Sequence, residues 1–230
     1  MGFVADVAGG AAVAVTAGPT APTASRGSLS VRGDVSLVPG PGGDRAVRMT
    51  SGHVVVDGVG DVTSGNVTVQ AWLRAAEAPR GRVVMSRRQG VTEVTVGIGA
   101  DGRPSVVVAS AAGPYRVSLA GVGRVDDGRW HQLAVVVAHK AFSRVEVSLV
   151  VDGRVVQSGQ MRPGLFGVSP DLSMTVPLQV GGLDGGLLLG GDLLVLAVRE
   201  ETVPVSRLAA AWAALLSDRA AVSGWGIPLV

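Results

Sequence analysis

Apolar and polar residues alternate in several short stretches of this 230-residue chain, and this pattern constrains the fold more than any other feature. The stretch 66–75, NVTVQAWLRA, places valine, alanine or leucine at every second position, and 144–153, RVEVSLVVDG, repeats the pattern. A shorter run, VRGDVSLV at 31–38, is also expected to be a strand. Because successive side chains of a strand point to opposite faces, these stretches predict sheets with one apolar face that needs a partner sheet.

Asp-Gly dipeptides recur between the predicted strands, and they favour the positive φ angles of tight hairpins. They lie at Asp57–Gly58, Asp101–Gly102, Asp127–Gly128, Asp152–Gly153 and Asp184–Gly185. We expect most of them to be hairpin tips. Strands of about six residues, with turns about every 8–12 residues, predict an antiparallel sandwich in a single domain.

One convincing helix is expected, near the carboxyl end of the chain. In the stretch 205–218, VSRLAAAWAALLSD, Ser206 is placed as an N-cap, and four apolar side chains share one helical stripe. These side chains are Leu208, Trp212, Leu215 and Leu216. We expect the helix to pack on the sandwich as a lid or a brace.

The charged residues argue against nucleic-acid binding. The formal net charge is +2, but the arginines are scattered, and Arg87–Arg88 is their only adjacent pair. A nucleic-acid-binding surface gathers its basic side chains on one face. Lys140 is the only lysine, and its context excludes a phosphate-binding P-loop. The chain has no cysteine, which excludes disulfides and thiolate metal sites.

The sequence lacks the residue patterns of the common hydrolases, and we expect that the protein is not an enzyme. Sandwich glucanases carry paired carboxylates on one strand, because one donates a proton while the other attacks or activates water. Here Glu93 and Glu146 stand alone on their strands, and Glu200–Glu201 alternate faces. The chain also has no Gly-x-Ser-x-Gly motif, and its three histidines form no His-Glu-x-x-His zinc motif.

The first 27 residues differ in composition from the rest of the chain. Asp6 is the only charged residue before Arg26, so the basic start of a cleaved signal peptide is missing. The apolar run is also too short and too rich in glycine to span a bilayer. We expect an N-terminal arm over 1–27 that docks on a partner subunit, a domain over 28–217 and a tail over 218–230.

Four segments carry a resemblance to a known family. In chain order they are NVTVQAWLRA, DDGRWHQLAVVV, SLVVDGRVVQSG and GGDLLVLAVREETVPVSRLAAAW. Over residues 28 to 217 the chain resembles laminin G-like domains. The resemblance implies an all-β fold, a concanavalin A-like antiparallel β-sandwich (jelly roll) with one C-terminal helix, here with an extended N-terminal arm. The closing strand departs from the family pattern, because Leu193 or Leu194 stands where many members carry an acidic residue.

Trp130 and His131 enter the strand GRWHQLAVVVA, and they could either hold a ligand or belong to the framework. The resemblance to laminin G-like domains implies framework residues at a strand start. We expect the Trp130 ring to fill space beside small neighbours such as Ala134, and His131 to satisfy backbone groups of the adjoining turn.

Trp72 and Gln70 are the candidate ligand-binding residues. Both lie on the side of their strand that faces away from its apolar core. On a concave polar face, a tryptophan can stack on a sugar ring while an amide binds the hydroxyls. The alternative is that the N-terminal arm or a long loop covers Trp72, since large aromatic side chains are seldom left exposed.

No cofactor is predicted. Laminin G-like modules often bind Ca²⁺ at the rim through carboxylate and carbonyl oxygens, so the resemblance makes a calcium site conceivable. Asp57, Asp61 and Asp192 are candidate donors, but each is equally well explained as a turn residue. We assign none of them.

Two functions of different class remain open at this point. The first is a non-catalytic structural subunit of a larger assembly, a tail or capsid-decoration protein of a bacteriophage virion that also binds a glycan or cell-surface polymer. The missing export signal and the N-terminal arm favour it, with other subunits as partners through the arm and tail. The alternative is a stand-alone lectin-like module, outside a bacterium or on its surface, that binds carbohydrate or protein. Neither requires nucleic acid or a membrane.

Overall fold

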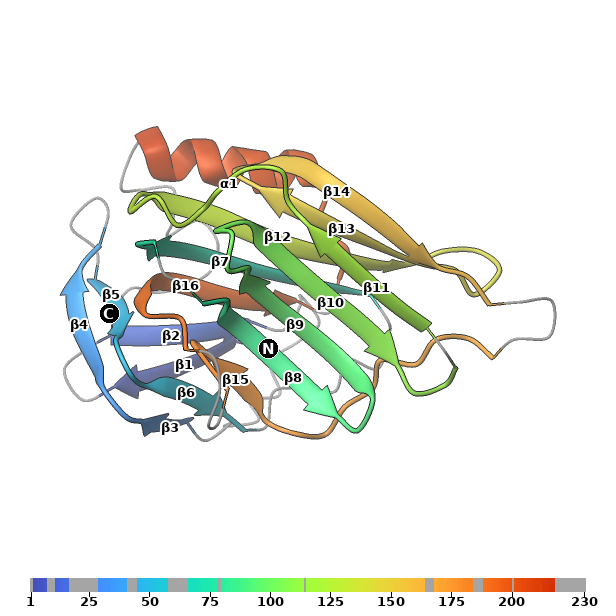
Figure 1. The fold of residues 1–230 in the computed structure, drawn as a ribbon, viewed down its shortest axis with the longest axis horizontal. Coiled ribbons are helices and arrows are strands. Elements are labelled where there is room, and N and C mark those ends of the chain that lie inside the picture. The colour runs from blue at the N-terminus through green and yellow to red at the C-terminus, as the bar shows by residue number, and fades with distance from the viewer. Residues whose placement is uncertain are drawn as a thin grey trace.

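The structure is a computed structural model that describes residues 2–7, 11–16, 29–40, 45–57, 66–77, 80–113, 115–163, 168–183, 188–199 and 201–217. Two seven-stranded sheets stack face to face, and helix α1 (Val205–Ser217) lies outside them (Figure 1). All the strand pairs are antiparallel, which confirms the predicted sandwich with a C-terminal helix.

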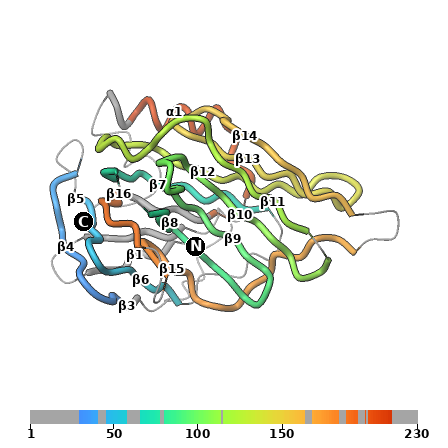
Figure 2. Tube along the Cα trace, in the orientation of Figure 1, coloured from blue at the N-terminus to red at the C-terminus, as the bar shows by residue number. Residues whose placement is uncertain are grey.

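The first sheet, sheet 1, carries the order β11-β10-β9-β8-β15-β6-β3. Its strands are β11 (Tyr115–Ala120), β10 (Pro104–Ser110), β9 (Thr92–Ile98), β8 (Arg82–Gln89), β15 (Leu178–Val180), β6 (His53–Val56) and β3 (Leu29–Arg32). Sheet 2 carries the order β14-β13-β12-β7-β16-β5-β4. Its strands are β14 (Arg154–Met161), β13 (Val145–Val151), β12 (Trp130–His139), β7 (Val67–Ala75), β16 (Gly191–Arg199), β5 (Arg45–Met49) and β4 (Val35–Pro39). Strand β16, near the carboxyl end of the chain, lies between β7 and β5 in this sheet (Figure 2).

The core lies between the two sheets and is built from the apolar side of each alternating strand. On β7 the inward side chains are Val67, Val69, Ala71 and Leu73, all nearly inaccessible to solvent, as the alternation predicts. Valine, leucine and methionine fill most of this space. Many small contacts between branched side chains therefore take the place of a few large aromatic ones.

The chain changes sheets at two neighbouring glycines, and here the structure corrects the sequence prediction. The run 31–38, expected as one strand, is divided at Gly33 into β3 in sheet 1 and β4 in sheet 2. Gly33 has a φ of 75°, and a Cβ there would lie 2.6 Å from the carbonyl oxygen of Ser51. A Cβ on Gly52 would meet the carbonyl oxygen of Arg32 at the same distance. Only glycine allows the two crossing segments to approach so closely.

The Asp-Gly dipeptides divide into two kinds. Asp101–Gly102 and Asp152–Gly153 are hairpin tips, between β9 and β10 and between β13 and β14, as predicted. Asp127–Gly128 is not a tip, because it precedes β12 in the connection from sheet 1 to sheet 2. Gly58 and the dipeptide at 184–185 lie outside the described residues. Gly128 also has a positive φ. The Asp-Gly dipeptide therefore predicts a glycine with a positive φ, but it does not predict whether the turn is a hairpin.

Helix α1 covers part of the outer face of sheet 2. It begins at Val205, and the carbonyl oxygen of Pro204 accepts bonds from the backbone N–H groups of Arg207 and Leu208. The prediction that Ser206 is the N-cap is therefore wrong, since Ser206 already lies in the first turn. Leu208 is fully buried in a cluster with residues of β12 and β13. No helix in the described part of the chain has the length and apolar character needed to cross a membrane.

Two further strands lie within residues 1–27, where the sequence predicted an extended arm. They are β1 (Gly2–Val7) and β2 (Ala11–Thr16), and they form an antiparallel hairpin. Strand β2 lies close to β16 and β5 of the same chain. The division of the chain into arm, domain and tail stays a prediction.

Candidate ligand-binding groove

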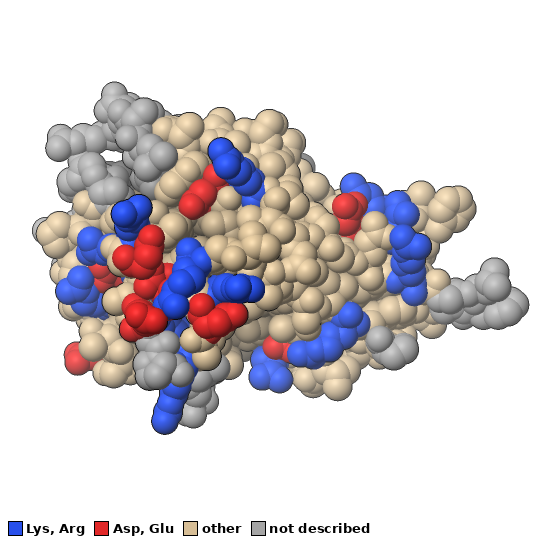
Figure 3. Space-filling model, turned by 45° about the horizontal axis from the view of Figure 1, so that its top comes forward, with Lys and Arg blue, Asp and Glu red and all other residues tan. Residues whose placement is uncertain are grey.

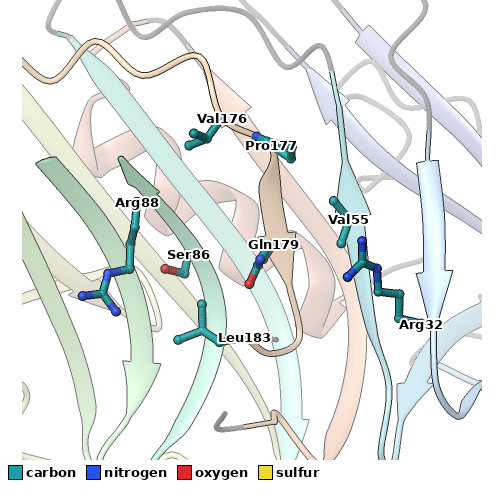
Figure 4. A pocket seen from close by; sticks show the side chains of 8 residues that line it. All are labelled: Arg32, Val55, Ser86, Arg88, Val176, Pro177, Gln179 and Leu183. Carbon is teal, nitrogen blue, oxygen red and sulfur yellow. The ribbon is translucent and has the colours of Figure 1, made fainter. Parts of the chain in front are cut away.

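A groove of about 550 Å³ opens on the outer face of sheet 1. Its floor is a row of three side chains across neighbouring strands: Val55 on β6, Gln179 on β15 and Ser86 on β8 (Figure 4). The strand registers explain the row, because Gln179 pairs with Val55 on one side and with Ser86 on the other. All three face outward because the residues beside them in sequence, such as Leu178 and Val180, point into the core.

The walls of the groove combine apolar and charged groups. Val176, Pro177 and Leu183 supply apolar surface from the segments before and after β15. Arg32 and Arg88 stand on opposite sides of the floor (Figure 4). A volume of this size lies within the range of about 300–1,000 Å³ that is typical of ligand pockets, and mixed lining of this kind is typical as well.

A hydrogen-bonded chain orients the hydroxyl of Ser86 on the groove floor. The Thr95 hydroxyl donates to Glu93 Oε1 at 2.9 Å, and Ser86 Oγ lies 2.8 Å from Thr95 Oγ1. Since the Thr95 proton is directed to the carboxylate, Ser86 donates to Thr95. The Ser86 oxygen then keeps its capacity to accept a hydrogen bond, although the residue is only 1% exposed.

Glu93 forms an ionic cluster beside the groove. Its side chain is mostly buried, and the guanidinium groups of Arg88 and Arg116 approach it at 3.7 and 3.4 Å. Its charge is thus balanced by two cations, Arg88 on the adjacent strand β8 and Arg116 on β11, which lies beyond β10. Among the described residues that line the groove itself, none is acidic. The carboxylate pair that glycoside hydrolysis needs is therefore not part of this lining.

The structure places Trp72 and Gln70, the candidates from the sequence, under cover rather than on an open face. Trp72 keeps 4% of its exposure and Gln70 only 1%. Trp72 packs in a cluster with Leu194 and with Ala211 of α1, and Trp130 and Trp212 border it. The cover that the structure shows over Trp72 thus includes α1. Ligand binding by Trp72 and Gln70 stays a prediction, and in this arrangement it requires the cover to move.

The buried amide of Gln70 forms no hydrogen bonds in the described part of the chain, since neither its Oε1 nor its Nε2 has a partner. Its neighbour Gln132 is better satisfied, because Nε2 donates to the carbonyl oxygen of Leu208 in α1 at 3.0 Å. Each buried polar group without a partner costs about 1–3 kcal/mol. The Gln70 amide is therefore expected to destabilise the covered face of sheet 2. Gln70 does not line the groove, which lies on sheet 1.

Trp130 and His131 lie in a bonded framework at the start of β12, which agrees with the role implied by the resemblance. The expected contacts were wrong in detail, because Trp130 borders the Trp72 cluster rather than Ala134, and His131 contacts two carboxylates rather than backbone groups. His131 Nδ1 lies 2.9 Å from Asp152 Oδ2, and Nε2 lies 3.0 Å from Asp127 Oδ1. The hydrogen bond with Asp152, followed by that with Asp127, raises the pKa of His131 despite its burial. The guanidinium of Arg74 lies over the Trp130 ring, 5.2 Å from its centre. His131 thus links the turn between β13 and β14 to the start of β12.

Asp192, a calcium candidate from the sequence, is already engaged by two arginines. Arg48 Nε donates to Oδ1 at 2.7 Å, and Arg74 Nη2 donates to Oδ2 at 2.5 Å. Burial raises the pKa of Asp192, but the bonds from Arg48 and Arg74 outweigh it and lower the pKa overall. Asp61 lies outside the described residues. Within the residues that the structure describes, no three metal-ligating His, Asp or Glu side chains gather.

Charges of both signs intermingle on the surface. Figure 3 shows acidic and basic side chains side by side at one end of the molecule, on the face in view. One such group contains Arg124, which pairs with the buried Asp126 at 3.0 Å and with Glu77 at 2.7 Å. Pairing of this kind spreads the basic side chains among acidic ones. It leaves no extended basic surface on the face shown.

Sequence reasoning missed the groove. Its lining comes from β3, β6, β8 and the region of β15, which are separated by long stretches of chain. The alternation in β8 does place Ser86 and Arg88 on one face, and that was the only local signal. No motif joins these residues to Gln179, because their proximity depends on strand order.

Comparison with protein families gives one match. Residues 48–187, more than half of the chain, match a model described as the concanavalin A-like lectin/glucanases superfamily. The matched range contains most of the groove, from Val55 to Leu183. No curated protein matches the chain significantly.

Solved structures with the same fold include receptor-binding domains of botulinum neurotoxins. The binding domain of neurotoxin DC, "in complex with SialylT", has a TM-score of 0.61 at 8% identity, covering 82% of this chain and 46% of that one. The receptor-binding domain of neurotoxin D has a TM-score of 0.62 at 11% identity, covering 92% and 51%. The serotype G binding domain has a TM-score of 0.61 at 9% identity, covering 83% and 47%. The chain thus spans about half the length of these domains, and at such low identity the likeness shows the fold alone.

Proposed function

Because the chain belongs to the concanavalin A-like lectin/glucanases superfamily, we propose that it is a non-catalytic module that binds carbohydrate in the groove of sheet 1. The observation that carries this proposal is the groove itself, in which an amide and a hydroxyl lie in one row with an apolar side chain. Sugars present both hydroxyl groups and apolar C–H faces, so they need both kinds of contact.

The floor and walls of the groove divide these contacts. The half-buried Gln179 amide and the nearly buried Ser86 hydroxyl supply the polar groups of the floor, and a sugar hydroxyl would have to reach them at the bottom of the groove. Val55, Val176 and Pro177 offer apolar surface to the faces of the ring. The absence of acidic residues from the described lining supports binding without hydrolysis.

The structural neighbours give limited support to a carbohydrate ligand. The binding domain of neurotoxin DC is in complex with "SialylT", and cell entry of botulinum neurotoxin type C is described as dependent upon interaction with two ganglioside molecules. These proteins are about twice the length of the matched part. They support carbohydrate as the class of ligand to test first.

Isothermal titration calorimetry after a glycan-array screen tests the proposal. We expect the protein to bind at least one glycan, and Gln179→Ala to weaken that binding about tenfold, the equivalent of about 1.4 kcal/mol. Gln160→Ala is the matched control, because Gln160 is exposed on β14 in the other sheet and should leave binding unchanged. The proposal fails if no glycan binds, or if the two variants bind alike.

The role in a bacteriophage virion stays a prediction, as does the virion as its location. It depended mainly on an arm that reaches a neighbouring subunit. Of the described strands within residues 1–27, β2 instead lies close to β16 and β5 of its own chain. The carbohydrate-binding alternative, whether outside a bacterium or on its surface, has the more specific support in the groove and the superfamily.

A further inference from the structure

Phe142 is the most exposed large apolar residue in the described part of the chain. It keeps 97% of its exposure, whereas the next, Val122, keeps 77%. Phe142 lies in the connection between β12 and β13, where the backbone N–H of Lys140 donates to the carbonyl oxygen of Arg144 at 2.8 Å and closes a three-residue loop. Figure 1 shows this connection at one end of the long axis of the molecule.

The backbone at Phe142 has an unfavourable conformation as well. Phe142 and Ser143 have φ angles of 61° and 58°, in the left-handed region that Gly, Asn and Asp enter more readily than a bulky aromatic residue. A single apolar side chain on a surface is common and needs no explanation by itself. Here exposure and backbone strain fall on one residue, and glycine or asparagine would avoid both. Strain of this kind gathers at functional sites, so the Phe142 ring is a candidate for contact with a partner.

Basic side chains flank Phe142. Lys140 and Arg144 lie at the two ends of the loop, and the pairing of β13 with β14 places Arg162, which follows β14, beside Arg144. Arg162 is exposed and bonds only to the neutral amide oxygen of Gln160, and Arg144 is half-buried. Within the residues that the structure describes, neither arginine pairs with a carboxylate.

Two carboxylates lie near these cations. Lys140 Nζ is 3.7 Å from Glu146 Oε2, and a solvent-exposed pair at this distance is weak. Burial lowers the pKa of His139 at the end of β12, and the negative charge of Asp171 opposes that shift. His139 is therefore uncharged at neutral pH. Three cations against two carboxylates leave a modest positive balance around the loop.

We propose that this loop inserts Phe142 into the surface of an anionic lipid bilayer. An aromatic ring gains by entering the boundary between headgroups and acyl chains, and Lys and Arg side chains beside it remain among the anionic headgroups. The inference goes beyond the proposed function, because the loop lines no part of the groove and needs no carbohydrate.

The size of the exposed tip favours a bilayer over a protein as the partner. A phenylalanine side chain offers about 150–250 Å² of surface, whereas each partner of a standard protein interface buries about 800 Å². A projecting loop also needs a partner that forms around it, and lipid headgroups rearrange readily. Insertion of one ring gives a weak, reversible attachment that nearby basic side chains strengthen.

Vesicle sedimentation with the full chain tests the inference. The probes are vesicles of phosphatidylcholine alone and of phosphatidylcholine with about one-third phosphatidylserine, and neither lipid carries a sugar. We expect binding to the anionic vesicles, and a partition coefficient about tenfold lower for Phe142→Asn. Asparagine accepts the left-handed backbone, so this variant should unfold at the same temperature or a higher one. Val122→Asn is the matched control, since Val122 is exposed but precedes β12, and it should leave binding unchanged.

A fluorescent label locates the part of the protein that meets the lipid. The chain has no cysteine, so Phe142→Cys and Val122→Cys each accept one environment-sensitive dye such as nitrobenzoxadiazole. On anionic vesicles we expect the emission to rise and shift to shorter wavelength at position 142 alone. Lys140→Gln should weaken binding more than Arg103→Gln, an equal change of charge at a half-exposed residue between β9 and β10.

Three results would overturn the inference. If Phe142→Asn binds anionic vesicles as well as the unchanged protein does, while Lys140→Gln does not, adsorption is electrostatic and the ring does not insert. If no vesicle binds, the loop has no affinity for lipid. If no vesicle binds and Phe142→Asn instead abolishes self-association in analytical ultracentrifugation, the partner is a second copy of this chain. None of these results bears on the groove, whose test uses soluble glycans.

Discussion

The two sheets use the same alternation but expose their outer faces differently. On sheet 2, Gln70 and Trp72 face outward and yet keep 1% and 4% of their exposure, and Trp72 packs against Ala211 of α1. On sheet 1, Ser86 and Val55 on the groove floor are nearly as buried, at 1% and 6%, but the arginines at the groove's two sides, Arg32 and Arg88, are exposed to solvent. An outward position in a strand is therefore not the same as an exposed one.

The difference has an energetic consequence. Residues on the covered face should affect stability, whereas residues of the groove should affect binding and leave stability nearly unchanged. The mutations below test that contrast, from the largest expected effect to the smallest.

Replacement of Trp72 by alanine should have the largest effect on stability. Loss of a buried tryptophan leaves a cavity and costs about 3–5 kcal/mol of unfolding free energy. Urea denaturation measures this change, and Arg88→Ala on the open face serves as the comparison, with an expected change within about 0.5 kcal/mol. A Trp72→Ala protein of normal stability that had lost glycan binding would reverse the assignment of the two faces.

Replacement of Gln70 by leucine should stabilise the protein. Leucine has a similar size and removes two buried polar atoms that lack partners, so the unfolding free energy should rise by about 1–3 kcal/mol. Gln132→Leu should be less favourable, because it breaks the bond to the Leu208 carbonyl. Chemical denaturation of both variants makes the comparison. A loss of stability on Gln70→Leu would mean that the amide has a role that the contacts do not reveal.

His131 should make stability depend on pH at the edge of the covered face. Its pKa is raised by Asp152 and Asp127, so the protonated form stabilises the fold fully below the ordinary pKa of about 6.5, and this contribution is lost as pH rises through the raised value. His131→Gln should therefore cost more stability at about pH 5.5 than at about pH 9, with a loss of about 1 kcal/mol at the lower pH. Equal losses at the two pH values would contradict an ionic role for His131.

A bulky residue in the groove should have the smallest effect on stability. Leu183→Trp places a large ring at a half-buried wall and should change the unfolding free energy by only about 0.5 kcal/mol. Glycan binding should nevertheless fall about tenfold or more, because the ring occupies the volume that the sugar needs. Calorimetry and thermal unfolding of the same preparation measure both effects. Undiminished binding would place the ligand elsewhere on the molecule.

Much of the fold could be predicted because its signals are local. The apolar side of β7 and the hairpins at Asp101 and Asp152 follow from alternation and turn chemistry within a few residues. The division at Gly33 could not be predicted in the same way, because the need for glycine arises from the carbonyl oxygen of Ser51, a residue of the opposing crossover. The N-cap was predicted at Ser206, two residues after Pro204, whose carbonyl oxygen accepts the first helical bonds, because cap residues locate helix ends only to within one or two residues.

The sequence by itself determined the strands, their inward sides and an antiparallel sandwich with a terminal helix, because side-chain alternation and turn geometry depend on neighbouring residues. Only the tertiary structure decided which outward residues are covered and which meet in the groove. Trp72 is buried by α1, more than 130 residues further along the chain, and Gln179 joins Val55 and Ser86 only through strand order. Such contacts come from long-range pairing, which a local pattern does not encode.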